Sequence, residues 1–201
     1  MMKFFMMLIL VIFSAIQTSA QSPVVDSEKA SQKMFSKDYI GAIEEYSKVI
    51  QSNPGDEYAH FFRGTAKFLL SDFKAALLDF NIQIEINPYF TDTYFSRGRT
   101  KFLIKDFKGA QNDFDKLIEK NPSYEDAFYM RGLTKLLQDK YEEAITDFDK
   151  AIVLDSKNAK AYYDRAYVNF LLKRKNSSCL DLRKALELGI NDYWEMEVNC
   201  K

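Results

Sequence analysis

The chain has 201 residues and a formal net charge of −1, with 28 Lys and Arg against 29 Asp and Glu. The basic residues are spread along the sequence, which argues against a nucleic-acid binder, and the length suffices for one domain with a substantial core. Abundant aromatic residues with few Gly and Pro favour a mostly helical protein with short turns.

Residues 1–20, MMKFFMMLILVIFSAIQTSA, have the pattern of a secretory signal peptide. Lys3 precedes an apolar run over residues 4–13, and small residues end the segment at Ala20, before Gln21. The run is shorter than the ~20 residues that span a bilayer. We therefore expect cleavage near Ala20 and a periplasmic or secreted protein. A retained N-terminal anchor is the alternative; a lipid anchor is excluded because position 21 is not Cys.

The rest of the chain repeats itself with a period of 34 residues. SKDYIGAIEEYSKVIQSNP, LSDFKAALLDFNIQIEINP and IKDFKGAQNDFDKLIEKNP end at Pro54, Pro88 and Pro122, and QDKYEEAITDFDKAIVLDS follows in the same frame. FFRGTAKFLL, FSRGRTKFLI, YMRGLTKLLQ and YDRAYVNFLL recur at the same spacing. Each unit carries two stretches of helical periodicity. The predicted units are 23–56, 57–90, 91–124, 125–158 and 159–189.

Small and large apolar residues alternate at fixed positions of these units. Position 8 holds Ala30, Gly64, Gly98, Gly132 and Ala166. Position 24 holds Tyr46, Phe80, Phe114, Phe148 and Leu182. This pattern resembles the tetratricopeptide repeat, and the resemblance covers nearly the whole chain after the signal segment. It implies an all-α solenoid, a right-handed superhelix of five helical hairpins whose first helices line the concave side.

Two charged ladders accompany the repeats. Position 7 holds Lys29, Arg63, Arg97, Arg131 and Arg165. Position 23 holds Glu45, Asp79, Asp113, Asp147 and Asp181. We favour pairing between the two helices of each hairpin, because the planar guanidinium can bind a carboxylate through two hydrogen bonds. The alternative interpretation is a charged surface that binds a ligand.

The resemblance implies that positions 2, 5, 9 and 12 face the concave groove. The candidate partner-binding residues are Tyr58, Phe61, Phe95, Arg99, Tyr129, Tyr163 and Tyr167. Aromatic side chains are typical anchors of interfaces, so we expect a groove for an extended peptide or an amphipathic helix. The alternative for position 5 is packing within the stack. The carboxylate clamp known in this family is excluded, because the first unit has Ser27 and Ser31 where a clamp needs Lys and Asn, and only Arg99 resembles part of the clamp pattern.

No recognisable catalytic set is present, and we expect no enzyme activity, no cofactor and no metal. The single histidine, His60, is interpreted as a packed helix residue, since a lone His has no partners for a zinc site. Asn176 begins an N-glycosylation sequon, which matters only in a host with that machinery.

The repeat pattern ends after Leu188. Gly189 can end the last helix in a left-handed turn, and residues 190–201 are predicted to form a short capping helix. Cys179 and Cys200 lie ten residues before and eleven after Gly189. A reversal there would bring them together, so we expect a disulfide in an oxidising compartment. Two free thiols are the alternative.

The sequence therefore predicts a non-enzymatic scaffold that binds a peptide or helix of a partner protein outside the cytoplasm. We expect a monomer or a weak homo-oligomer that contacts the membrane only if the signal segment is retained as an anchor. The alternative function is a structural, self-associating solenoid whose groove holds its own segment or that of another copy. The sequence does not identify the partner.

Overall fold

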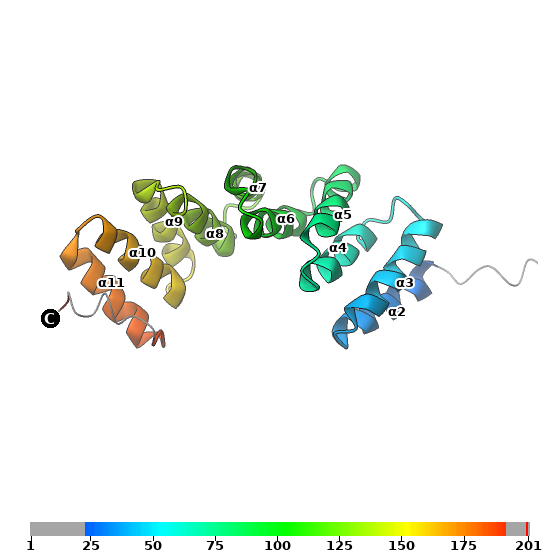
Figure 1. Cartoon of the computed structure of the whole chain (residues 1–201), viewed down its shortest axis with the longest axis horizontal. Helices are drawn as coiled ribbons and strands as arrows, with labels where there is room; N and C mark the ends of the chain where they lie inside the picture. The colour runs from blue at the N-terminus through cyan, green and yellow to red at the C-terminus, as the bar shows by residue number, and fades with distance from the viewer. Residues whose placement is uncertain (1–22, 192–199, 201) are drawn as a thin grey trace, which may run out of the picture.

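The computed structural model describes residues 23–191 and 200, and in this part of the chain it has ten α-helices and no strand (Figure 1). The helices are α2 (Pro23–Phe35), α3 (Tyr39–Ser52), α4 (Ala59–Leu69), α5 (Phe73–Ile86), α6 (Thr91–Leu103), α7 (Phe107–Lys120), α8 (Glu125–Leu136), α9 (Tyr141–Leu154), α10 (Ala159–Leu171) and α11 (Lys175–Glu187). The all-α fold is as predicted. The predicted signal segment and residues 192–199 and 201 of the predicted capping helix lie outside the described residues.

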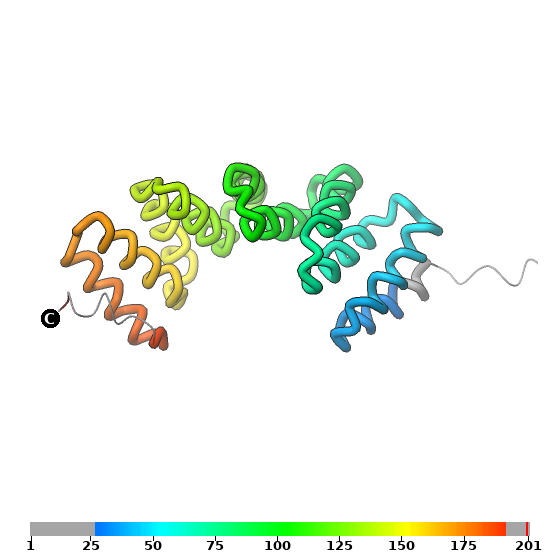
Figure 2. The backbone as a smooth tube through the Cα atoms, in the orientation of Figure 1, coloured from blue at the N-terminus to red at the C-terminus, as the bar shows by residue number. Residues whose placement is uncertain are grey.

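The helices pair into five successive hairpins, from α2 with α3 to α10 with α11, and each hairpin packs on the next. The stack forms an arch, and its path is clearest as a tube (Figure 2). Figure 1 shows α4, α6 and α10 toward the inner side of the arch and α5, α7 and α11 toward the outer side. Contacts also join α4 to α6, α6 to α8 and α8 to α10. The first helices therefore line the concave side, as predicted. No helix of the described residues is long and apolar enough to span a bilayer.

The turn inside each hairpin has the same construction. Position 15 adopts positive φ in all five units, at Lys37, Ser71, Lys105, Asp139 and Lys173. In the first three units, the aspartate at position 16 caps the second helix; the side chain of Asp106, for example, accepts a hydrogen bond from the backbone N–H of Gly109 at 2.9 Å. The five hairpins therefore share a positive-φ residue at the same position of the turn.

The core of each hairpin is a contact between positions 8 and 24. The rings of Phe80, Phe114 and Phe148 are fully buried, and each lies against the glycine of its own first helix. A Cβ atom added to Gly98 would lie 2.8 Å from Cε1 of Phe114. The glycine is therefore required by close approach of the two helices. The first and last units have alanine at position 8, with Tyr46 at position 24 of the first and Leu182 at position 24 of the last, and Ala30 and Ala166 are both buried.

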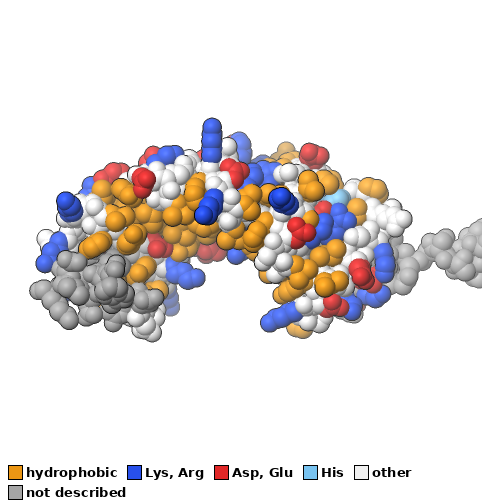
Figure 3. Space-filling view, in the orientation of Figure 1, with side chains coloured by type: hydrophobic (Ala, Val, Ile, Leu, Met, Phe, Trp, Pro, Cys, Tyr) orange, Lys and Arg blue, Asp and Glu red, His pale blue; other side chains and the backbone are white. Residues whose placement is uncertain are grey.

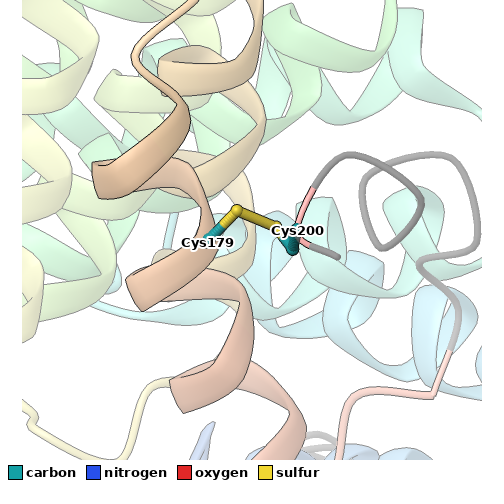
Figure 4. The surroundings of a disulfide bond; sticks show 2 residues. All are labelled: Cys179 and Cys200. Carbon is teal, nitrogen blue, oxygen red and sulfur yellow. A yellow bond between two sulfur atoms is a disulfide. The ribbon is translucent and has the colours of Figure 1, made fainter.

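A disulfide between Cys179 of α11 and Cys200 ties the C-terminal end of the chain to the last hairpin (Figure 4). The two cysteines are 21 residues apart in the sequence and their Cα atoms are 5.5 Å apart. In the chain-entropy model, closing a loop of this size contributes about 3 kcal/mol to stability. The described residues contain no free cysteine.

We predict that Gly98→Ala lowers the free energy of unfolding by about 1–2 kcal/mol, because the new methyl group would displace the Phe114 ring. Adding Phe114→Leu, which reproduces the pair of the last unit, should make the double variant more stable than the sum of the two single changes implies. Urea denaturation of the four proteins measures this coupling.

Gly55→Ala is the matched control, because the nearest atom to its new Cβ would be Oδ1 of Asn53, at 3.9 Å. It should leave stability nearly unchanged. Strictly additive effects of the Gly98 and Phe114 substitutions would show that the glycine serves another purpose.

Candidate functional site

Four arginines at position 7 join the two helices of their hairpins. Nε of Arg97 lies 3.0 Å from Oδ2 of Asp113, and Nη2 lies 2.6 Å from Oδ1. The same pair of hydrogen bonds joins Arg63 to Asp79, Arg131 to Asp147 and Arg165 to Asp181. This confirms the predicted pairing of the two ladders. The charged groups of these residues are therefore paired with each other inside the stack.

Each of these arginines also reaches back to the preceding hairpin through Nη1. The acceptors all lie at position 25, and they are Ser47, Asn81, Asp115 and Asp149. One guanidinium thus fixes both the register within a hairpin and its placement on the hairpin before. The sequence analysis did not predict this second contact.

The position-23 carboxylates are nearly inaccessible; Asp79 is 1% exposed. Lys67 at position 11 adds a contact of 2.7 Å to Oδ2 of Asp79. Burial by itself would raise the pKa of Asp79, but hydrogen bonds from Arg63 and Lys67 outweigh it and the pKa is lowered. His60, buried beside this carboxylate with Nδ1 3.5 Å from Oδ1, is a packed helix residue, as expected.

Two of the predicted groove aromatics, Phe61 and Phe95, also pack within their own repeats. The centroid of the Phe95 ring lies 5.2 Å from that of Tyr124 and 6.2 Å from that of Phe114. Phe61 lies 4.8 Å from Phe90 in the same way. These half-buried rings therefore form the floor of the inner face and stabilise the hairpins at the same time.

The other predicted groove residues differ in exposure. Tyr58 and Tyr167 are 46% and 39% exposed, whereas Tyr163 is half-buried against the core around Leu182. Partner binding to any of these side chains stays a prediction.

Tyr129 joins two successive first helices. Its hydroxyl donates a 2.8 Å hydrogen bond to Oδ2 of Asp164 in the next unit. Burial raises the pKa of Asp164 to about 6, although the hydrogen bond from Tyr129 and the charge of Lys160 both lower it. Burial, followed by the charge of Asp164, raises the pKa of Tyr129. The contact between these two first helices thus contains a carboxyl group whose pKa is raised by burial.

Arg99 is held differently from the position-7 arginines. Its Cζ atom lies 5.3 Å from the ring centroid of Phe68 and 5.6 Å from that of Phe95, at the distance of a cation–π contact. Its side chain is exposed, and no acceptor in the described part of the chain hydrogen-bonds to its guanidinium. Beside it lies a pocket of about 130 Å³.

An exposed row of large apolar side chains, which was not predicted from the sequence, follows the same face. Position 13 holds Phe35, Leu69, Leu103, Leu137 and Leu171, which we call the inner apolar row. These residues are between 37% and 93% exposed. Positions 5, 9 and 13 are four residues apart and share one helix face, and Leu69 lines the pocket beside Arg99. Figure 3 shows a band of hydrophobic side chains that follows the arch. The signal was in the sequence, where each first helix ends in a large apolar residue.

Among the described residues, no group of three or more His, Cys, Asp or Glu side chains is arranged to hold a metal ion.

Comparison with known proteins identifies the repeat. Residues 135–173, from the end of α8 through α10, match the family model described as TPR repeat. The match shows that this segment is a TPR repeat. The 34-residue period and the succession of five similar hairpins extend the resemblance to the tetratricopeptide repeat over the other units. Among curated protein sequences, none matches the chain.

Several solved structures share the fold at low sequence identity. MamA is 20% identical, with a TM-score of 0.78 over 83% of this chain and 91% of that protein. YrrB, described as a TPR protein with an unusual peptide-binding site, is 16% identical, with a TM-score of 0.77 over 92% and 96%. A tetratricopeptide repeat protein from Parabacteroides merdae is 20% identical, with a TM-score of 0.77 over 90% and 72%. At these identities the likeness concerns the fold.

We predict that Arg97→Ala lowers the melting temperature, with a loss of about 2 kcal/mol in the free energy of unfolding, because it leaves the buried Asp113 with only Lys101 as a charged partner. Lys116→Ala, which breaks an exposed pair with Glu119, is the control and should have little effect. Thermal melts followed by circular dichroism give both values. An unchanged melting temperature for Arg97→Ala would contradict the structural role.

We predict a pH-dependent difference between the wild type and Asp164→Asn. A carboxyl whose pKa is raised in the folded state favours folding below its ordinary pKa of 3.8, and this advantage is lost as the pH rises through about 6. The stability of the wild type relative to the variant should therefore fall between pH 4 and pH 7.5, by up to about 3 kcal/mol. Urea denaturation at both pH values tests this, and parallel pH profiles would contradict it.

Proposed function

We propose that the protein is a non-enzymatic scaffold that binds an extended segment of a partner protein along the inner face of the arch. The observation that carries the proposal is the inner apolar row, in which every repeat leaves a large apolar side chain exposed. Contiguous exposed apolar surface of this kind marks interaction sites in soluble proteins.

The charge distribution supports the same face. The position-7 arginines and their carboxylates are paired within the stack, so they are not available to form a charged docking surface. Apolar contacts spaced by one repeat suit a ligand that lies along the arch. YrrB, which shares the fold, is described as having a peptide-binding site, which is compatible with this use of the scaffold.

We further propose that the protein works outside the cytoplasm. The pattern of residues 1–20 is that of a secretory signal, and the disulfide between Cys179 and Cys200 is of a kind that persists in oxidising compartments.

A structural, self-associating role is the second candidate. It is favoured by the first hairpin, which leaves Phe35 93% exposed and Ile40 64% exposed. Either side chain could contact a second copy of the chain.

To test the scaffold function, a photo-crosslinking amino acid is introduced at Leu103, in the inner apolar row, and at Leu78, an equally apolar and 65% exposed residue of the outer helix α5. In cells of the native host, Leu103 should crosslink a discrete partner protein and Leu78 should not. Leu103→Asp should then weaken binding of that partner at least about tenfold, whereas Leu78→Asp should not.

Both leucines are at least half exposed, so both aspartate variants should keep the wild-type melting profile. Equal crosslinking from the two faces, or full binding by Leu103→Asp, would contradict the proposal. Crosslinks only between copies of the chain, with a concentration-dependent size in solution, would establish the self-associating role instead.

A further inference from the structure

The most distinctive group on the inner face is Arg99, since it is a cation in a row of otherwise neutral residues. The other units have Ser31, Thr65, Leu133 and Tyr167 at position 9. Its Cζ atom lies within cation–π distance of the rings of Phe68 and Phe95, and such contacts do not use up the N–H donors of the guanidinium. The neighbours of this guanidinium are therefore aromatic rings instead of a hydrogen-bonded carboxylate.

The charged groups around Arg99 leave it unpaired. Asp126 is close enough for the two charges to interact, but no hydrogen bond or ion pair joins them. The pKa of Asp126 is raised, mainly by desolvation and next by Glu125, while Arg99 and Lys160 lower it. Arg99 therefore keeps its full set of donors, whereas Arg97, two residues earlier in α6, uses all three of its nitrogens.

The pocket beside Arg99 has an apolar floor. It is lined by Thr65, Phe68, Leu69 and Phe80 from one hairpin and by Ser96 and Arg99 from the next. Its volume of about 130 Å³ is close to that of the cavity of about 150 Å³ that holds benzene in another protein. The pocket therefore has room for one aliphatic or aromatic side chain, and Arg99 stands at its rim.

We propose that this pocket, between the second and third hairpins, recognises a large apolar residue next to an Asp or Glu in the partner segment. The apolar side chain fills the pocket, and the carboxylate accepts hydrogen bonds from the edge of the Arg99 guanidinium. The inference rests on the proposed binding of an extended segment along the arch. It adds which types of residue that segment carries at this pocket.

The carboxylate belongs to a side chain within the segment and not to its C-terminus. The inner apolar row continues on both sides of the pocket, through Phe35 toward one end of the arch and through Leu103 and Leu137 toward the other. A chain that makes these contacts passes Arg99 and does not end there.

The test is a selection of random linear peptides, displayed with both ends fused so that no free carboxyl terminus is present, against the full protein. Wild-type protein should enrich peptides in which a large apolar residue adjoins Asp or Glu. For a selected peptide, replacing that acidic residue by its amide should weaken binding to wild-type protein about tenfold, and this difference should vanish for Arg99→Gln. Arg99→Glu should select Lys or Arg at the same place.

Two variants separate the parts of the proposal. Arg183→Gln makes the same change at an exposed arginine of α11 and should keep the acidic preference. Leu69→Gln should weaken the apolar preference and keep the acidic one.

Peptides that bind through the inner apolar row, shown by loss of binding in Leu103→Asp, but have no acidic preference would overturn this inference and leave the proposed function standing. An acidic preference that appears only with peptides that have a free C-terminus would show that Arg99 binds a terminal carboxylate and not a side-chain carboxylate. That result would also overturn this inference. Failure to select any peptide would count against both.

Discussion

The guanidinium at position 7 is the contact on which the geometry of this solenoid depends. In each of four hairpins it binds both oxygens of a buried carboxylate in its own second helix and reaches back to position 25 of the hairpin before. A buried ion pair gives little net stability, because desolvation offsets attraction. The N–H donors of the planar guanidinium nevertheless point in fixed directions. A hairpin displaced from its observed position would therefore leave a buried carboxylate unpaired. The arginines therefore act mainly on register.

This arrangement separates the charges that hold the stack from the surface available to partners. The ladder residues are paired across helix–helix interfaces, and the inner face is left with aromatic rings, the inner apolar row and a few isolated charges. Arg99 and Asp164 are the informative ones among these. Arg99 lies against two aromatic rings and has no hydrogen-bonded acid, while Asp164 is desolvated and accepts a hydrogen bond from the Tyr129 hydroxyl. Each is a polar group placed where apolar contacts alone would suffice for packing.

Much of the fold could be predicted from the sequence because the packing rules repeat. A small residue at position 8, a large apolar residue at position 24 and the paired ladders recur every 34 residues, so the pattern in each unit supports the interpretation of the others. The inner face was harder to predict. Whether Phe95 packs or binds depends on Tyr124, which lies 29 residues away and meets it only in the folded hairpin. The exposure of position 13 depends on the curvature of the stack, and the Nη1 contact to position 25 depends on how one hairpin sits on the next.

The coupling between hairpins is graded along the arch. The acceptors at position 25 change from the neutral Ser47 and Asn81 to the charged Asp115 and Asp149, and hydrogen bonds to a charged acceptor are the stronger kind. The last hairpin is further tied by the disulfide, whereas the first has the more exposed Lys29 in place of an arginine. In a linear repeat protein, stability is close to a sum of neighbour terms, so the charged acceptors add most to the C-terminal interfaces. The first interface relies more on apolar packing, because Tyr46 and Val49 of the first hairpin and Ala59 of the second are buried in one core cluster. Polar contacts and apolar burial therefore contribute in different proportions at the two ends of the arch.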